Sequence, residues 1–139
     1  MILVDTGFLY ALLDRDDAWH ARAVAACDAI DEAWVTTWPV LTEAVYLLTR
    51  TLGTAQAQAL MREVGDGEIT VWNPPIEAVQ RLPVLMKRYA DPPMDLADAS
   101  LVVLAEALGH GRILTTDERD FHAYRWKSRS PFENLLAGF

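Results

Sequence analysis

Residues 2–13 read ILVDTGFLYALL, and this stretch decides the fold class. The apolar run Ile2–Val4 has the length and residue types of a short buried strand, Asp5 ends it, and Phe8–Leu13 continues as a short helix. The same alternation of short apolar runs and longer helical stretches recurs along the chain. It is typical of an α/β domain with a parallel sheet and right-handed crossovers.

The residue pattern also predicts where the other elements lie. Asp16 or Asp17 is expected to cap the second helix, Thr54 to cap a later one, and Gly53 and Gly109 to end the helices before them. The expected strands are 2–4, 34–37, 69–72, 112–115 and a short one at 124–126, and the expected helices are about 8–13, 18–30, 39–52, 54–64, from the prolines at 74 and 75 to 89, and 95–108.

Length and composition set limits on the class of protein. A chain of 139 residues that is 52% hydrophobic fits one folded domain, residues 1–139, with one core. The lone Cys27 excludes an internal disulfide and is expected to be a small buried residue. With no signal peptide and no uncharged stretch of about 20 residues, we expect a cytoplasmic protein without membrane contact.

The net charge of −8 argues against a nucleic-acid binder, which normally carries a basic face. The distribution of charge weakens that objection, because basic residues gather late in the chain and bound cations would cancel part of the acidic charge. The late basic group consists of Arg112, Arg119, Arg125, Lys127 and Arg129.

Acidic residues mark the expected carboxyl ends of two strands. Asp5 follows the first strand, and Asp117 follows the fourth, with Asp120 three residues on. Ligands of open α/β sheets bind beyond these strand ends. Three more acids lie on or before helices: Glu43 in the apolar stretch PVLTEAVYLL, and Asp95 and Asp98 at the start of DLADASLVVLAEAL.

A shared cation explains why carboxylates would gather there. A carboxylate buried alone is costly, whereas Mg²⁺ and Mn²⁺ prefer oxygen ligands and make such a group favourable. Each acid also has a structural interpretation. Asp5, Asp95, Asp98, Asp117 or Asp120 could cap a helix or turn, a role that is compatible with binding a cation. The three histidines show no zinc spacing, and no nucleophile-elbow serine is present.

Taken in order, the segments LVDTGFLYALL, TEAVYLL, MDLADASLVVLAE and ILTTDERDF resemble the PIN-domain ribonucleases, and most closely the VapC-type toxins of toxin–antitoxin pairs. The resemblance implies a three-layer α/β/α sandwich with a mostly parallel sheet of about five strands. It also implies Mg²⁺- or Mn²⁺-dependent endonuclease cleavage of RNA. Carried onto this chain, the metal-binding and catalytic acids would be Asp5, Glu43, Asp98 and Asp117.

The resemblance assigns further roles as expectations. Asp5, Asp98 and Glu43 would hold one metal that activates water, and Asp117 would position water or a second metal. Thr6 and Thr116 could hydrogen-bond a ligand carboxylate or water. Asp95 is an additional acid without a clear role, and Asp120 is an alternative to Asp117 as the fourth acid. The late arginines would steer phosphate.

Expected partners are an RNA substrate, a small antitoxin whose helical tail covers the acids, and a second copy of the chain. Exposed apolar residues of the third and fourth helices, such as Leu47, Leu48, Leu60 and Met61, are expected to make the dimer contacts. Three alternatives stay open at this point: a standalone PIN nuclease, a non-catalytic PIN-like binding module, and, more distantly, an aspartic protease suggested by the Asp5-Thr6-Gly7 tripeptide.

Overall fold

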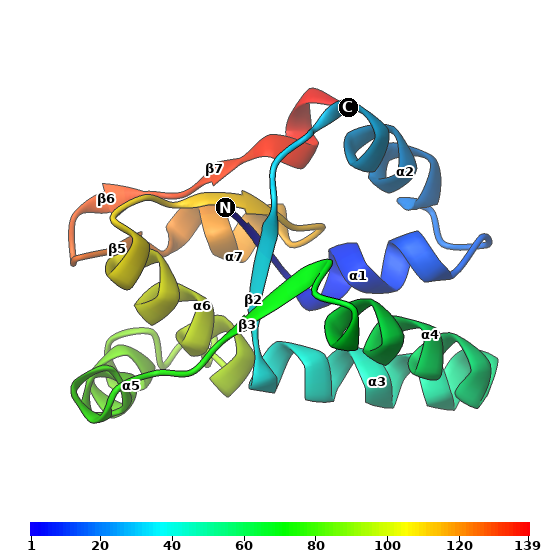
Figure 1. The fold of residues 1–139 in the computed structure, drawn as a ribbon. Helices are drawn as coiled ribbons and strands as arrows, with labels where there is room; N and C mark the ends of the chain where they lie inside the picture. Colours follow the sequence, from blue (N-terminus) through cyan, green and yellow to red (C-terminus); the bar gives the residue numbers. More distant parts are fainter.

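The computed structural model describes all of residues 1–139 and shows a five-stranded parallel sheet with helices on both faces (Figure 1). The strand order is β3-β2-β1-β4-β7. The elements are β1 (Ile2–Val4), α1 (Thr6–Leu13), α2 (His20–Ala29), β2 (Trp34–Thr37), α3 (Trp38–Leu52), α4 (Thr54–Gly65), β3 (Ile69–Trp72), α5 (Ile76–Arg88), α6 (Leu96–Leu108), β4 (Arg112–Leu114), α7 (Glu118–Ala123), β5 (Arg125–Trp126), β6 (Ser130–Pro131), β7 (Glu133–Asn134) and the 3₁₀ helix η1 (Leu135–Gly138).

The chain order places a topological switch in the middle of the sheet. From β1 the chain moves outward through β2 to β3, then crosses back to β4 and continues to β7 on the other side of β1. Because parallel crossovers are right-handed, the helices of the two halves cover opposite faces. Figure 1 shows α5 and α6 on one side of the strands and α1, α3 and α4 on the other. The crevice between β1 and β4 is therefore the expected ligand position.

The central strand is buried throughout, which explains its continuous apolar sequence. Ile2, Leu3 and Val4 are all inaccessible to solvent, and β1 pairs with β2 on one side and β4 on the other. Helix α6 packs across the sheet with eight buried residues in its thirteen, so it is apolar nearly all round. When neighbouring strands flank a strand and helices cover both of its faces, none of its side chains points to solvent. Its sequence therefore does not alternate between apolar and polar residues.

The fold class, the parallel sheet and the main elements confirm the sequence-based expectations, with local corrections. The strand expected at 124–126 is wrong as a member of the main sheet: β5 pairs antiparallel with β6 in a separate two-stranded sheet. The fifth strand of the main sheet is the two-residue β7, paired with β4. So short a strand carries no periodicity. Helix α7, which starts right after Asp117, was not expected.

Two expected helix caps are also wrong. Trp19 occupies the cap position of α2, and Asp17 instead accepts from the Trp19 backbone N–H at 2.9 Å. Gly53 is the cap residue of α4, and Thr54 is already helical. The connection between α3 and α4 is so short that one glycine, with φ of +89°, ends the first helix and begins the second.

Three expectations about exposure are wrong as well. Cys27 is exposed, at the rim of an apolar groove of about 550 Å³ between α1, α2 and α4. Leu48 and Leu60 are 0% and 2% exposed, because they form the contact between α3, α4 and the core. Leu47 and Met61 are half-buried. Periodicity indicates a helix's apolar face, but not whether the chain itself covers it. None of the helices is both long and apolar enough to span a bilayer.

Candidate metal centre

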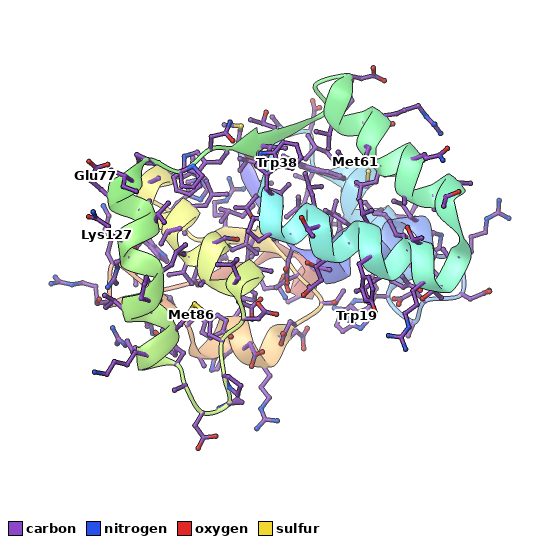
Figure 2. All side chains as sticks on the ribbon, turned by 90° about the horizontal axis from the view of Figure 1, so that it is seen from below. Trp19, Trp38, Met61, Glu77, Met86 and Lys127 are labelled. Atoms are coloured by element: carbon purple, nitrogen blue, oxygen red, sulfur yellow. The ribbon has the colours of Figure 1, made fainter.

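The acids expected to act together converge at the carboxyl edge of the sheet, around the switch between β1 and β4. Asp5 follows β1, Asp117 follows β4, and Asp98 lies in the first turn of α6. Asp98, Asp117 and Asp120 each bring one carboxylate oxygen within 4.8 Å of the others. Figure 2 looks onto this edge of the sheet from below. We refer to Asp5, Glu43, Asp98, Asp117 and Asp120 as the acid cluster.

Asp5 is held by two hydrogen bonds inside the protein. Its Oδ1 accepts from the Thr6 backbone N–H at 2.7 Å, which caps α1, and its Oδ2 accepts from Thr115 Oγ1 at 2.8 Å. Burial raises the pKa of Asp5 from 3.8 to about 6. The hydrogen bonds from Thr115 and Thr6 oppose that increase, and the charges of Asp117 and Glu43 add to it. Asp5 is thus both a helix cap and a buried carboxyl group that responds to its acidic neighbours.

Asp98 has the larger shift. Burial, followed by the charges of Asp5 and Asp95, raises the pKa of Asp98 from 3.8 to about 8, against a hydrogen bond from Tyr124 that lowers it. Burial also raises the pKa of Asp117 above its ordinary value. The hydrogen bond from the Asp120 backbone N–H opposes that increase, and the Asp120 carboxylate adds to it. No cation of the protein is among the causes for any of the three. The site therefore gathers carboxyl groups without a basic side chain that would favour their ionisation.

The structure gives different positions to Asp95 and Asp120, the two acids beyond the four expected ligands. Asp95 is the N-cap of α6 and accepts from the Asp98 backbone N–H at 2.8 Å, so its capping interpretation holds. Asp117 caps α7 by accepting from the Asp120 backbone N–H at 3.2 Å, and both carboxylates lie near Asp98. Asp117 and Asp120 thus share one corner of the cluster.

Glu43 lies on α3 and is half-buried, although its neighbours in the sequence are mostly apolar. It lines a groove with Trp38, Tyr46 and Asp95, and its charge acts on Asp5. The helix that carries it is tied to α6, because Thr37 at the α3 N-cap and Ser100 of α6 share a hydrogen bond of 2.6 Å. Glu43 therefore stands at the edge of the cluster.

The threonine that contacts the acids is a residue the sequence pattern did not single out. Thr115 Oγ1 donates to Asp5 and accepts from the Asp117 backbone N–H at 2.9 Å, so it links two acids. Of the expected supporting residues, Thr6 contacts Asp5 through its backbone N–H, while its hydroxyl donates to the Val40 carbonyl at 3.5 Å. Thr116 packs against Gly7. Thr115 is the first residue after β4, which ends at Leu114, and its hydroxyl faces the site. The segment TTD alone does not show which of its two threonines comes directly after the strand.

Two further residues near the acids were missed because their contacts are distant in sequence. Tyr124 donates from its hydroxyl to Asp98 Oδ2 at 2.9 Å across 26 positions. Asn134 of β7 accepts from Thr115 N and donates to Thr115 O, at 3.3 and 3.1 Å, which extends the β4–β7 pairing to Thr115. Neither residue belongs to a motif or a periodic face, so no sequence signal identifies it.

Some of the arginines that were expected to steer phosphate are already bound to other groups of the protein. Arg112, at the start of β4, lies at the opposite edge of the sheet and pairs with Glu32 through two 2.8 Å hydrogen bonds. Arg125 uses Nη1 to bind the carbonyls at the end of α7. Arg119, in the first turn of α7 and exposed, is the basic residue of this group that follows Asp117 most closely.

Close packing explains why the third residue of the Asp5-Thr6-Gly7 tripeptide is a glycine. A Cβ at this position would collide with Thr116 Oγ1 and lie 3.3 Å from Thr116 Cβ. We expect Gly7→Ala to lower the free energy of unfolding by about 1–3 kcal/mol, because the loop after β4 must shift. Urea unfolding would measure this. Gly65→Ala is the matched control, since nothing lies within 4 Å of a Cβ there. Equal stability of Gly7→Ala and the wild type would contradict the close packing.

Residues 2–127 match the PIN domain family, and the chain therefore belongs to that family. It is similar to Ribonuclease VapC26 of Mycobacterium tuberculosis, with 30% identity over 124 residues that cover 89% of this chain and 92% of the relative. Its fold is that of the crystal structure of VapC20 from the same organism, a sarcin–ricin loop cleaving toxin. The TM-score is 0.79 at 22% identity, over 86% of this chain and 92% of that one. The family resemblance expected from the acidic motifs is confirmed.

Proposed function

We propose that this chain is a divalent-metal-dependent endoribonuclease that hydrolyses RNA phosphodiester bonds and serves as the toxin of a toxin–antitoxin pair. The observation that carries the proposal is the acid cluster, in which Asp98, Asp117 and Asp120 each bring a carboxylate oxygen within 4.8 Å of the others. The charges of Asp117 and Glu43 act on Asp5, that of Asp5 acts on Asp98, and none of these acids forms a salt bridge. Kinship with a VapC ribonuclease supports the choice of RNA as substrate.

The donor set fits a hard divalent ion. All the groups offered by the cluster are carboxylate oxygens, which Mg²⁺ and Mn²⁺ prefer, and no histidine or cysteine is among them. When bound, such an ion supplies Lewis acidity toward water and toward the phosphate oxygens. Asp5, Asp98 and Glu43 would hold it, while Asp117, with Asp120 beside it, would hold a second ion or orient water.

Each residue's local contacts support its role. Asp5 is presented rigidly, since the Thr6 N–H and the Thr115 hydroxyl both hold its carboxylate. Thr115 also fixes Asp117 through its backbone, so the ends of β1 and β4 are set relative to each other. Asp5 N donates to Leu114 O at 3.1 Å, which adds a third link. Such preorganisation is what a catalytic carboxylate site needs.

The direct test is cleavage of single-stranded RNA by the purified protein with Mg²⁺, with Mn²⁺, or with EDTA. We expect cleavage with either metal and none in EDTA, with activity restored when metal is added in excess of the chelator. Cleavage that continues unchanged in EDTA would contradict the proposal. The aspartic-protease alternative fits neither the parallel α/β sheet nor the PIN family, and pepstatin is expected to have no effect.

The antitoxin partner follows from the same charge distribution. A small protein that places an arginine in the acid cluster would offset charge that the chain itself leaves uncompensated. Co-expression with a neighbouring small gene product and loss of RNA cleavage in the complex would support a toxin role. A chain that cleaves RNA but has no such partner would be a standalone PIN nuclease.

A homodimer is also proposed, with a contact surface different from the one the sequence suggested. Trp38 and Tyr46 of α3, which are 48% and 60% exposed, line one groove together with Leu96 of α6, which is 47% exposed. Exposed aromatic side chains of this size are typical of interface residues. Figure 2 labels Trp38 at the start of α3. Light scattering that shows only monomer at micromolar concentration would exclude the dimer.

A further inference from the structure

Tyr124 stands next to the acid cluster without being part of it. The residue follows α7 directly, is 5% exposed, and its hydroxyl donates to Asp98 Oδ2 at 2.9 Å. No other side chain of the protein donates a hydrogen bond to the Asp98 carboxylate. Oδ1 of Asp98 accepts no hydrogen bond from the protein and is therefore available to a ligand.

The ring of Tyr124 is held firmly in place. It packs edge-to-face against Tyr89 and Phe121, with ring centroids 5.0 and 5.2 Å apart and interplanar angles of 72° and 84°. Its backbone N–H donates to the Asp120 carbonyl at 3.0 Å. Because both ring and backbone are fixed, the position of the hydroxyl is set by the core rather than by solvent.

This contact also joins two segments that must agree for the cluster to form. Asp98 belongs to the start of α6, whereas Asp117 and Asp120 belong to the start of α7. Tyr124, at the far end of α7, reaches back to α6. A carboxylate side chain has two rotatable bonds, so one hydrogen bond to a fixed donor restricts the directions its free oxygen can take. Partners that orient ligands in this way tune metal affinity.

We propose that Tyr124 is a positioning residue that fixes the carboxylate of Asp98 so that its free oxygen is oriented for a divalent cation bound at the acid cluster. The inference rests on the proposed function in that it requires a cation at the acid cluster. It goes further by assigning a role to a core tyrosine that binds neither cation nor substrate. The competing interpretation is that the hydrogen bond merely satisfies a buried hydroxyl.

The chain offers a matched pair of variants for the test. Tyr124→Phe removes the hydroxyl that contacts Asp98 and keeps the ring. Tyr89→Phe removes a hydroxyl from the same aromatic group, where it accepts from the Arg125 backbone N–H at 3.0 Å and touches no acid. Both variants lose one hydrogen bond, and the two rings pack against each other, although Tyr89 is half-buried and Tyr124 is buried. A general packing effect would therefore appear in both, and a positioning effect only in Tyr124→Phe.

The primary measurement is the Mn²⁺ dissociation constant of each metal-free protein by isothermal titration calorimetry, below the melting temperature of every variant. We expect Tyr124→Phe to bind Mn²⁺ about 10-fold more weakly than the wild type, and Tyr89→Phe to stay within about twofold. In cleavage assays, Tyr124→Phe should need about 10-fold more Mn²⁺ for half-maximal rate. Its rate at saturating Mn²⁺ should return close to that of the wild type.

Each contrary outcome identifies what fails. Equal Mn²⁺ affinity for Tyr124→Phe and the wild type would overturn the positioning role while leaving the metal site intact. Equal weakening in both variants would assign the effect to packing and would also overturn it. A wild-type protein that binds no Mn²⁺ would refute the proposed metal site itself, and the inference would fall with it.

Discussion

Asp5→Asn is expected to reduce Mn²⁺-dependent RNA cleavage at least about 100-fold, more than the loss typical of residues that only orient a metal ligand. The substitution keeps the shape of the side chain and an oxygen for the Thr6 N–H, so α1 should keep its cap. What it removes is the negative charge at the end of β1. The rate of RNA cleavage under saturating Mn²⁺ measures the loss.

Two controls make the Asp5 result interpretable. Asp66→Asn neutralises an exposed acid at the end of α4, next to the start of β3 and hence at the opposite edge of the sheet, and should leave cleavage unchanged. Asp5→Asn purified in parallel also detects contaminating nuclease, because a contaminant would cleave equally in both preparations. Full activity of a folded Asp5→Asn protein would sink the proposal that this carboxylate takes part in the reaction.

The second large effect that we expect concerns stability. The metal-free protein should lose stability as pH rises, and bound metal should reverse that loss. The pKa of Asp98 is raised to about 8 and that of Asp5 to about 6, both from 3.8. In the metal-free protein the folded state therefore retains protons that the unfolded chain releases as pH rises from about 4 to about 8. Across this window the contribution of these groups to stability falls with rising pH.

The neighbouring groups that act on the pKa of Asp98 all raise it, with one exception. Asp5, Asp95 and Asp117 oppose its ionisation through their charges, and only the hydrogen bond from Tyr124 favours it. Asp14, whose pKa is lowered by a hydrogen bond from Tyr10, loses its stabilising contribution only at lower pH. Measurements between pH 5.5 and pH 8 therefore exclude Asp14. Burial lowers the pKa of His110 from 6.5, which adds an opposing rise in stability within this window, so the comparison with Asp98→Asn is what singles out the acid cluster.

We expect the melting temperature in EDTA to fall between pH 5.5 and pH 8, and Mn²⁺ to raise it most at pH 8. At a Mn²⁺ concentration 100 times the dissociation constant, the ion would contribute about 2.7 kcal/mol, or roughly 5–10 °C for a chain of this size. Asp98→Asn should flatten the pH dependence in EDTA and weaken the response to Mn²⁺. A wild-type melting temperature that does not respond to millimolar Mn²⁺ at pH 8 would count against a cation site at the cluster.

The acidic net charge takes on a different meaning once the cluster is located. Part of the charge of −8 belongs to carboxylates that a bound cation would neutralise. Of the late basic residues, Arg112 and Arg125 are engaged elsewhere, so the interaction with RNA phosphate would depend more on the bound cation and on Arg119 than on a broad basic face. Cleavage by such a protein should need metal both for binding substrate and for chemistry.

The sequence alone determined the fold class, and together with the family resemblance it predicted the acids of the site, with Asp120 left as an alternative to Asp117. Val4 and Leu114 end buried strands and acids follow within a few residues, so the carboxyl edge of a parallel sheet had to collect Asp5 and Asp117. Asp98 could be placed because it lies in the first turn of a helix whose apolar sequence is unmistakable. Strand ends and apolar helices are local patterns, so they can be recognised from consecutive residues of the sequence.

Tertiary structure alone decided how the acids are held and what lies exposed. The hydroxyl that links Asp5 to Asp117 belongs to Thr115 rather than Thr116, because the strand ends one residue earlier than expected. The contact between Tyr124 and Asp98, and the short strand β7 that supports Thr115 through Asn134, join residues far apart in sequence. Such contacts depend on how helices and strands pack together, and that information is not carried by the spacing of residues along a single segment.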